Sequence, residues 1–285
     1  MPAPDPQAPP EPLPPQQPLL SQQPSEPRVA LVTGAARGIG AATVLTLAAA
    51  GWRVLAVDRA ADDPDLPYPL GTRAGLEQLA ADAGPDVAIA EADVRDVPAL
   101  ARAVATAEDR WGHLDAALAV AGVIAGGVPA WEVPPGQEQA VLDIDLGGVI
   151  NLARVAMPAL LRHPEPRHGR FLAVASAAAT RGLPMLAAYC AAKSGVAGFV
   201  RALGAELRDT GVTANAVSPG STATPILDES ARLYGLPSKN AFAAQQPLGR
   251  LLDPAEVAAV LAFLAGDGAS AMTGAVVPVD GGLAL

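Results

Sequence analysis

The sequence has one cysteine, three histidines and few residues of positive charge, and each scarcity excludes a class of protein. A single cysteine cannot form an intramolecular disulfide, so we expect a cytoplasmic protein rather than a disulfide-stabilised secreted domain. Lysine and arginine number 19 against 29 aspartates and glutamates, a net charge of −10, and the basic residues do not cluster. Without a positive face, we expect no binding to nucleic acid or to an anionic membrane.

Long uninterrupted apolar runs are also missing. Glycine, proline or a charged residue breaks each run before it reaches the roughly 20 residues that span a bilayer, so we predict that the chain does not cross a membrane. Hydrophobic residues nevertheless make up 51% of the 285 residues, which is enough for a substantial core.

The N-terminal segment 1–27 contains 11 of the 29 prolines and almost no branched or aromatic apolar side chains. Such a composition buries too little apolar surface to offset the entropy lost on ordering, and we predict a disordered arm. Its proline-rich stretch could bind a groove that recognises polyproline II, which leaves an interaction scaffold as an alternative function.

From Arg28 onward, short apolar runs alternate with longer segments of helical period. This alternation predicts one α/β domain over 28–285, a Rossmann-type doubly wound parallel sheet with helices on both faces. The expected strands are 28–33, 52–58, 86–93, 114–120, 169–176, 211–218 and 275–280, and the expected helices are about 39–50, 98–111, 137–161, 188–209 and 254–264.

Two segments interrupt the alternation. Residues 59–76 are an insertion after the second strand, where such folds often need only a short turn. Residues 221–247 lie between the sixth strand and the last helix, where we expect a lid over the substrate. A neutral surface insertion is the alternative interpretation of 59–76.

A glycine-rich turn, "TGAARGIG", joins the first strand to the first helix. Gly34 suits the tight turn, Gly38 lets the backbone approach a diphosphate, and Gly40 lets the helix pack close to the strand. Because Asp58 ends the next strand 18 residues later, we predict a dinucleotide-binding site.

The acid at the end of the second strand bears on the choice of cofactor. Asp58 could accept hydrogen bonds from the adenosine ribose, whereas a 2′-phosphate would meet like charge, so NAD is favoured over NADP. Arg37 and Arg59 keep NADP open, because an inward guanidinium could neutralise that phosphate. Asp93 could meet the adenine edge or cap the next turn.

Tyr189 and Lys193 lie one turn apart on one face of the predicted helix 188–209. A nearby ammonium stabilises a phenolate and lowers its pKa, so Tyr189 could exchange a proton with an alcohol or a carbonyl. Cys190 lies between them in sequence, points about 100° away on a helix and has no adjacent histidine, and we interpret it as a packing residue. The three histidines have no spacing of a triad or a metal site, so we predict no metal.

Together these motifs resemble the classical short-chain dehydrogenases/reductases over essentially all of 28–285. The resemblance includes the glycine turn, "ADV" at 92–94, Ser176 thirteen residues before Tyr189, "YCAAK", "NAVSPG", "LGRLLDPAEVA" and "TGAVVPVDGG". It implies an NAD(P)-dependent alcohol dehydrogenase or carbonyl reductase in which Ser176 binds the substrate oxygen, Tyr189 is the acid/base, and Lys193 holds the ribose and tunes Tyr189. The cofactor contacts that it implies are Gly34, Arg37, Gly38, Ile39, Gly40, Asp58, Arg59, Asp93, Val94, Ala121, Gly122, Tyr189, Lys193, Pro219, Gly220, Thr222 and Thr224.

The chain departs from that family at two positions. It reads "AVAG" where the family has "NAG", so Ala121 and Gly122 keep the backbone contacts but lose a side-chain brace. Asp145 stands at the family's fourth catalytic residue, an asparagine that holds a relay water through its main-chain carbonyl beside a helix distortion. The part of Asp145 in catalysis is therefore open, and loss of activity in a noncatalytic redox sensor is an alternative.

A narrower resemblance rests on the insertion and on the stretches "WGHLDAALAVAGVIAGG" and "VASAAATRGLPMLAAYCAAK". These are similar to the subfamily coupled to the redox carrier mycofactocin. The resemblance implies that the insertion covers a bound NAD, which the external carrier reoxidises in place. Proteins that the chain resembles pair their long helices into tetramers, and the alanine-rich segments 137–161 and 188–209 suit such packing, so we expect a homotetramer. The apolar residues of 221–247 suggest a small, mostly apolar alcohol or ketone as substrate.

Overall fold

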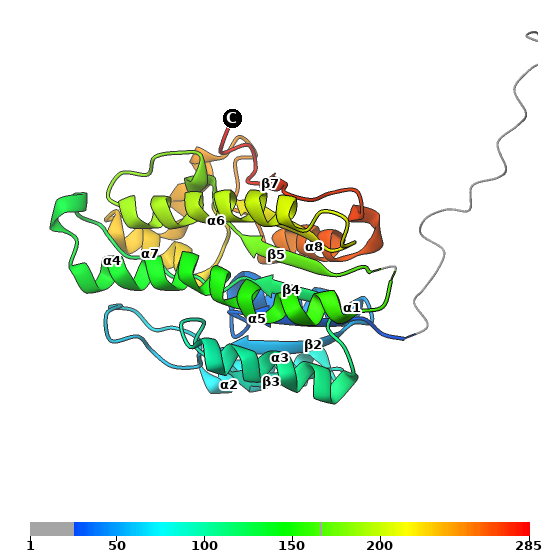
Figure 1. Ribbon diagram of the computed structural model, residues 1–285. Helices are drawn as coiled ribbons and strands as arrows, with labels where there is room; N and C mark the ends of the chain where they lie inside the picture. Colours follow the sequence, from blue (N-terminus) through cyan, green and yellow to red (C-terminus); the bar gives the residue numbers. More distant parts are fainter. Residues whose placement is uncertain (1–25, 166) are drawn as a thin grey trace, which may run out of the picture.

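The computed structural model describes residues 26–165 and 167–285, and within them seven parallel strands form one sheet in the order β3-β2-β1-β4-β5-β6-β7 (Figure 1). The order reverses between β1 and β4, which makes the carboxyl ends of these two strands the topological switch point. The strands are β1 (Val29–Thr33), β2 (Arg53–Asp58), β3 (Val87–Glu91), β4 (Ala116–Ala119), β5 (Arg170–Val174), β6 (Thr213–Pro219) and β7 (Val276–Val279). The predicted fold class is confirmed.

Helices cover both faces of the sheet. Helices α3, α5 and α6 pack on one face, and α1, α2 and α8 pack on the other. The helices are α1 (Gly38–Ala49), α2 (Arg73–Ala83), α3 (Val97–Trp111), α4 (Pro135–Leu142), α5 (Gly148–Arg162), α6 (Ala187–Glu206), α7 (Pro225–Leu233) and α8 (Pro254–Ala265), with a π-helical segment η2 (Asp143–Gly147) and short 3₁₀ segments η1 (Ala130–Glu132), η3 (Ala177–Ala179), η4 (Lys239–Gln245) and η5 (Asp267–Ala269).

The central strands read as continuous apolar runs because both of their faces are covered. All five residues of β1 and all five of β5 are buried. Helix starts carry the expected caps: Asp96 accepts a hydrogen bond from Ala99 N at the start of α3, and Asp253 and Glu256 form a capping box at the start of α8. Burial therefore accounts for the strands, and the capping residues account for where helices α3 and α8 begin.

Three helical features differ from the sequence expectations. The predicted helix 137–161 is interrupted by the π-helical segment 143–147, where the backbone bulges and re-aims its side chains. Helix α2 begins inside the predicted insertion 59–76, because Thr72 caps it and Leu76 and Leu79 bury into the core. Helix α7 and segment η4 lie within 221–247, so the predicted lid is largely helical.

The stretch Pro135–Arg162 is the one part of the described chain that is long and apolar enough, by composition, to cross a bilayer. Half of its apolar window is buried inside the fold, and the core helices of globular domains pass the same test. Residues 1–25 lie outside the described part of the chain, so the predicted N-terminal arm is not tested.

Candidate active site

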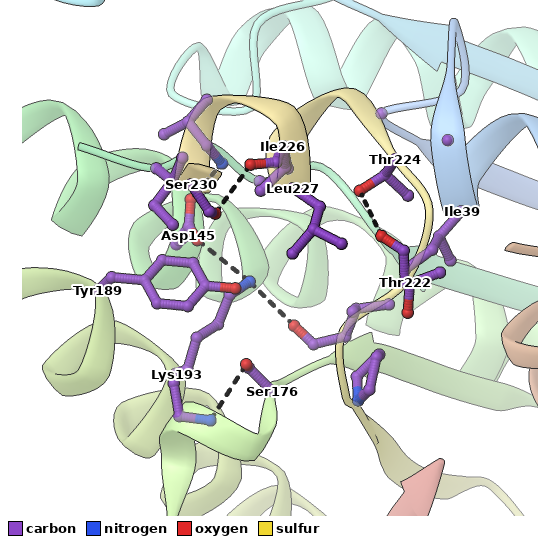
Figure 2. Close-up of a pocket in the computed structure, with 18 of the residues that line it drawn as sticks. Ile39, Asp145, Ser176, Tyr189, Lys193, Thr222, Thr224, Ile226, Leu227 and Ser230 are labelled. Atoms are coloured by element: carbon purple, nitrogen blue, oxygen red, sulfur yellow. Dashed lines mark hydrogen bonds and ion pairs between the residues drawn. The ribbon is translucent and has the colours of Figure 1, made fainter. Parts of the chain in front are cut away.

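A cavity of about 630 Å³ opens at the carboxyl ends of the strands and extends under α7 and η4. Every residue that the sequence analysis assigned to catalysis or cofactor binding lines it. Figure 2 shows Ser176, Tyr189, Lys193 and Asp145 converging on one side, with Thr222 and Thr224 across from them. Segments far apart in the sequence thus meet in one cavity of a size that suits a cofactor and a small substrate.

The glycine-rich turn forms the floor of the cavity between β1 and α1. Gly34 has a φ of +68°, a left-handed conformation that glycine adopts without strain. A Cβ on Gly40 would lie 2.0 Å from the Gly34 carbonyl oxygen, so only glycine allows the helix this close to the turn. The start of α1 therefore presents its free N–H groups to the cavity, as a diphosphate requires.

Asp58 lines the cavity at the end of β2. Its Oδ2 accepts a hydrogen bond from Ala36 N at 3.0 Å, and its Oδ1 accepts one from Ala60 N at 3.0 Å. Each carboxylate oxygen keeps a further lone pair for a ligand. The backbone thus fixes an acid at the position that the sequence predicted for the adenosine ribose.

Arg37 and Arg59, which could have neutralised the 2′-phosphate of NADP, bind protein groups instead. Arg37 donates to the Pro69 carbonyl oxygen at 2.7 Å, and Arg59 pairs with Asp63 and, at 3.3 Å, with Asp93. These partners place both guanidinium groups on the insertion. Neither arginine offsets the charge of Asp58 in this structure.

The insertion is fixed by a buried carboxylate. The Asp63 side chain is 0% exposed, receives a hydrogen bond from Asp65 N at 3.0 Å, and binds both Arg59 and Arg95. Arg95 also binds Asp93, so one ionic network joins the insertion to the end of β3. Asp93 is held within this network.

A tyrosine ties the other end of the insertion to the cavity wall. Ile124 N donates a hydrogen bond to the Tyr68 hydroxyl at 2.8 Å, and burial raises the pKa of Tyr68 well above its usual range. Sequence reasoning did not single out this residue, nor Leu70 and Gly71, which line the cavity. The one sequence signal for Tyr68 was the scarcity of tyrosine, of which the chain has three.

Ser176, Tyr189 and Lys193 come from the end of β5 and the first turns of α6. The Ser176 hydroxyl accepts a hydrogen bond from Ala178 N at 3.1 Å, which fixes the side chain at the start of η3. The Lys193 ammonium lies 5.6 Å from the centre of the Tyr189 ring and donates to the Val174 carbonyl oxygen at 3.1 Å. The predicted one-turn spacing therefore places the ammonium next to the phenol.

Asp145 takes a part that the sequence analysis did not anticipate. The expected contribution was its main-chain carbonyl beside a helix distortion, and the distortion is present as η2. The side chain, however, is fully buried and lies 3.1 Å from the Lys193 ammonium. The lost brace at Ala121 is also offset in part, because the Asp145 Oδ1 accepts from Val123 N at 2.8 Å, just beyond that position.

The charge balance at Tyr189 also differs from the expectation. Burial raises the pKa of Tyr189, the Lys193 ammonium acts against this, and the Asp145 carboxylate adds to the rise. The net shift is upward, although the sequence reasoning anticipated a lowered pKa from lysine alone. Burial and a second charge, which sequence spacing does not show, reverse the direction.

The segment after β6 closes the cavity. Ser221 N donates to the buried Gln246 Oε1 at 2.8 Å, and Gln246 Nε2 donates to the Arg250 carbonyl oxygen at 2.6 Å. Tyr234 donates to the Pro184 carbonyl oxygen at 2.7 Å, which joins the lid to the loop after Ser176. Gln246 is a further residue that the sequence analysis missed, and its buried contacts position the loop that carries Pro219, Gly220, Thr222 and Thr224.

Cys190 and the histidines stand outside this chemistry. The Cys190 sulfur accepts a weak hydrogen bond from Leu183 N at 3.4 Å, as a packing residue would. His113 and His163 flank Asp115 at the opposite end of the strands. Over 26–165 and 167–285, no group of three or more histidine, cysteine or acidic side chains has the geometry of a metal site.

Comparison with known proteins agrees with this geometry. A family model described as enoyl-(acyl carrier protein) reductase matches residues 34–284. The short-chain reductase protein NovJ of Streptomyces niveus is 38% identical over 90% of this chain and 94% of its own length. The (-)-trans-carveol dehydrogenase of Rhodococcus erythropolis is 34% identical over 91% and 98%. The crystal structure of a carveol dehydrogenase from Mycobacterium avium in complex with NAD superposes with a TM-score of 0.83 at 30% identity, covering 90% of this chain and 97% of that one.

The fold and the cavity define a nicotinamide-dependent oxidoreductase of the Rossmann type. The chain belongs to the short-chain dehydrogenase/reductase family.

Proposed function

We propose that the chain is an NAD-dependent dehydrogenase/reductase that interconverts a small, mostly apolar alcohol and its ketone. The observation that carries this proposal is the convergence of Ser176, Tyr189 and Lys193 in the same cavity as the glycine turn and Asp58. A bound nicotinamide would supply or accept the hydride at the substrate carbon. The protein's own side chains then handle the oxygen atom and its proton.

The catalytic roles follow from the donors and acceptors that remain free. The Ser176 hydroxyl accepts from the backbone and keeps its own proton, so it can donate to a substrate oxygen. Tyr189 gives its phenolic proton to that oxygen during reduction and takes it back during oxidation. The Lys193 ammonium has a donor left for a ribose hydroxyl after its contacts with Val174 and Asp145.

The residues around the adenosine end favour NAD over NADP. Asp58 keeps lone pairs for ribose hydroxyls, whereas a 2′-phosphate there would meet its negative charge. Two cations could reverse this preference, but Arg37 binds the Pro69 carbonyl oxygen and Arg59 pairs with Asp63 and Asp93. This arrangement supports NAD as the cofactor.

The substrate side of the cavity supports an apolar alcohol or ketone. The lid and the loops that face it contribute branched and aromatic side chains, namely Ile124, Leu183, Leu186, Ile226, Leu227 and Phe242. A compact apolar substrate would displace water from these surfaces, which leaves Ser176 and Tyr189 as the polar partners of its one oxygen. The two carveol dehydrogenases among the similar proteins are consistent with such a substrate.

We further propose that NAD stays bound and is reoxidised in place by an external carrier, for which mycofactocin is the candidate. The network around Asp63 and the Tyr68 contact hold segment 59–72 against the cavity, and Leu70 and Gly71 line its adenosine end. A segment held at both ends slows cofactor release, because several ionic and hydrogen-bonded contacts must open together.

We also propose a homotetramer that works in the cytoplasm. The family resemblance supports the tetramer, and the alanine-rich helical segments 137–161 and 188–209 suit close packing between subunits. The single cysteine is consistent with a reducing compartment.

Native mass spectrometry of the purified protein tests cofactor retention and subunit number together. We expect four subunits, each with one NAD, and slow exchange when labelled NAD is added. Stoichiometric exchange within the mixing time would contradict the retained cofactor while leaving the dehydrogenase activity open.

The Tyr189→Phe variant tests the chemistry itself, assayed with an artificial electron acceptor and a panel of cyclic secondary alcohols. We expect turnover to fall by about 10²-fold or more while NAD remains bound. Cys190→Ser is the matched control and should keep a rate close to that of the wild type, because Cys190 does not line the cavity and its sulfur contacts the backbone of Leu183. Unchanged oxidation in Tyr189→Phe would refute the mechanism.

A further inference from the structure

A buried carboxylate lies behind the Tyr189–Lys193 pair, on the π-helical segment 143–147. The Asp145 side chain is 0% exposed, and the widened π turn directs it toward the loop after β4 and toward α6. A carboxylate in such a place is costly unless its charge is matched. Its partners therefore indicate what it does.

The two oxygens of Asp145 have separate partners. Oδ1 accepts a hydrogen bond from Val123 N at 2.8 Å, while Oδ2 lies 3.1 Å from the Lys193 ammonium and has no hydrogen-bond partner of its own among the described residues. One oxygen thus braces the β4 loop through an interaction that an uncharged amide could also make. The other oxygen faces the Lys193 ammonium. Burial raises the pKa of Asp145, and the Lys193 ammonium acts against this rise by favouring the carboxylate.

The backbone of Gly122 packs closely against this ion pair. A Cβ on Gly122 would lie 3.3 Å from the Lys193 ammonium and 3.4 Å from the Asp145 Oδ2. The ammonium itself is nearly buried, with its side chain 5% exposed. Because solvent is largely kept away, the charge of Asp145 is weakly screened at Lys193 and at its neighbours.

The charged and titratable groups that act on Tyr189 come from two elements. Helix α6 supplies Lys193 and Cys190, and segment η2 supplies Asp145. Among these, Lys193 is the one cation. Burial acts to lower the pKa of Lys193, but the Asp145 carboxylate and Tyr189 together outweigh burial and raise that pKa, so the ammonium stays charged.

We propose that Asp145 is a positioning residue whose side chain holds the Lys193 ammonium in an ion pair and thereby keeps the Tyr189 hydroxyl protonated through neutral pH. An ammonium already matched by a carboxylate stabilises a phenolate less than a free ammonium does. Tyr189 is then mostly protonated over the neutral range. Alcohol oxidation, the direction in which a carrier reoxidises the bound cofactor, needs the phenolate and therefore becomes faster as pH rises. The proposal rests on Tyr189 being the acid/base of the proposed function.

The Asp145→Asn variant removes the charge and keeps an oxygen that can accept from Val123 N. Its effect on the phenol is read directly from the ultraviolet absorbance of the phenolate, titrated in the wild type and in the variant, with Tyr189→Phe versions of both to isolate the Tyr189 signal. We expect the pKa of Tyr189 to fall by about one unit or more in Asp145→Asn. The matched control is Asp143→Asn, which removes an acid from the same segment whose contact is with Gln139, and it should leave the titration unchanged.

The pH dependence of alcohol oxidation is the second measurement. The alkaline-favoured limb of kcat/KM should move to lower pH by the same amount in Asp145→Asn, with KM for the alcohol changed less than threefold. An unchanged phenolate titration would overturn the proposal whether or not the protein oxidises alcohols, whereas absent activity with a shifted titration would overturn only the proposed function. Asp145→Ser, which also removes the charge, serves as a second variant. Loss of folding in both variants would overturn the proposal by making Asp145 a structural residue.

Discussion

The substitution Asp63→Asn tests whether the insertion is held by its buried charge. Asp63 is fully buried between Arg59 and Arg95 and also accepts a hydrogen bond from Asp65 N. Asparagine keeps the shape and one acceptor oxygen but removes the charge that both guanidinium groups share. The contacts of Asp63 are local to 59–72 and the end of β3, so we expect local opening of the insertion rather than global unfolding.

The size of the effect follows from these contacts. A hydrogen bond to a charged group contributes about 1.5–3 kcal/mol, and two are weakened here. Both arginines are partly exposed, with side chains 28% and 29% accessible, and both keep Asp93 as a partner. We therefore expect a loss of about 2 kcal/mol after screening by solvent, which is about a thirtyfold increase in local opening.

Amide hydrogen exchange measures this opening directly. Peptides covering 60–72 should exchange about thirtyfold faster in Asp63→Asn, while peptides of β1 should be unaffected. Dissociation of bound NAD should accelerate in parallel. Asp62→Asn is the matched control, because Asp62 accepts only from Leu70 N at an exposed site and asparagine can replace it there. Exchange within threefold of the wild type would refute the electrostatic account of the insertion.

The same network predicts a pH dependence with a definite sign. Burial acts to raise the pKa of Asp63. The hydrogen bond from Asp65 N and the guanidinium groups of Arg95 and Arg59 together lower this pKa by more than burial raises it, so the folded pKa lies below its usual value. The stabilisation is therefore present above the unfolded carboxyl pKa of about 3.9 and is lost as pH falls through the lower folded value. Below about pH 4 the wild type should approach the opening of Asp63→Asn.

Two further substitutions test the cofactor side of the cavity. In Gly40→Ala, a methyl group 2.0 Å from the Gly34 carbonyl oxygen must displace the turn. We expect the affinity for NAD, measured by calorimetry, to fall at least about tenfold. Unchanged affinity would contradict the close approach of helix and turn. In Asp58→Ser, loss of the carboxylate should raise the affinity for NADP relative to NAD by at least about tenfold. The reason is that one like-charge pair at 4 Å costs about 4 kcal/mol at an effective dielectric of 20. An unchanged affinity ratio would show that Asp58 does not select the cofactor.

The elements of the sheet were predictable because their signal is local. Strands buried on both faces read as apolar runs, and each of the seven observed strands overlaps a predicted one. Helix α2 was missed because its start lies in a proline-rich insertion, although Thr72 before Leu76 and Leu79 was a usable signal. The interruption of 137–161 was not apparent from helical period and was expected only through the family resemblance, which places a helix distortion beside Asp145.

The candidate site was predictable to the extent that its residues lie in motifs. Spacing placed Tyr189 and Lys193 on one face, and the glycine turn and Asp58 marked the cofactor end. The arginine partners of Asp63 and the Tyr68 contact were not predictable, because they join segments whose approach depends on how the insertion folds over the sheet.

The sequence alone therefore determined the parallel sheet and the glycine-rich turn, because both depend on local spacing, and its motifs supplied the candidate reacting side chains. Tertiary structure decided their electrostatics. It buried Asp145 against Lys193 and turned Arg37 and Arg59 toward the insertion. Charge interactions depend on the distance between the groups and on the exclusion of water. For residues in separate motifs, both are set only when the chain folds.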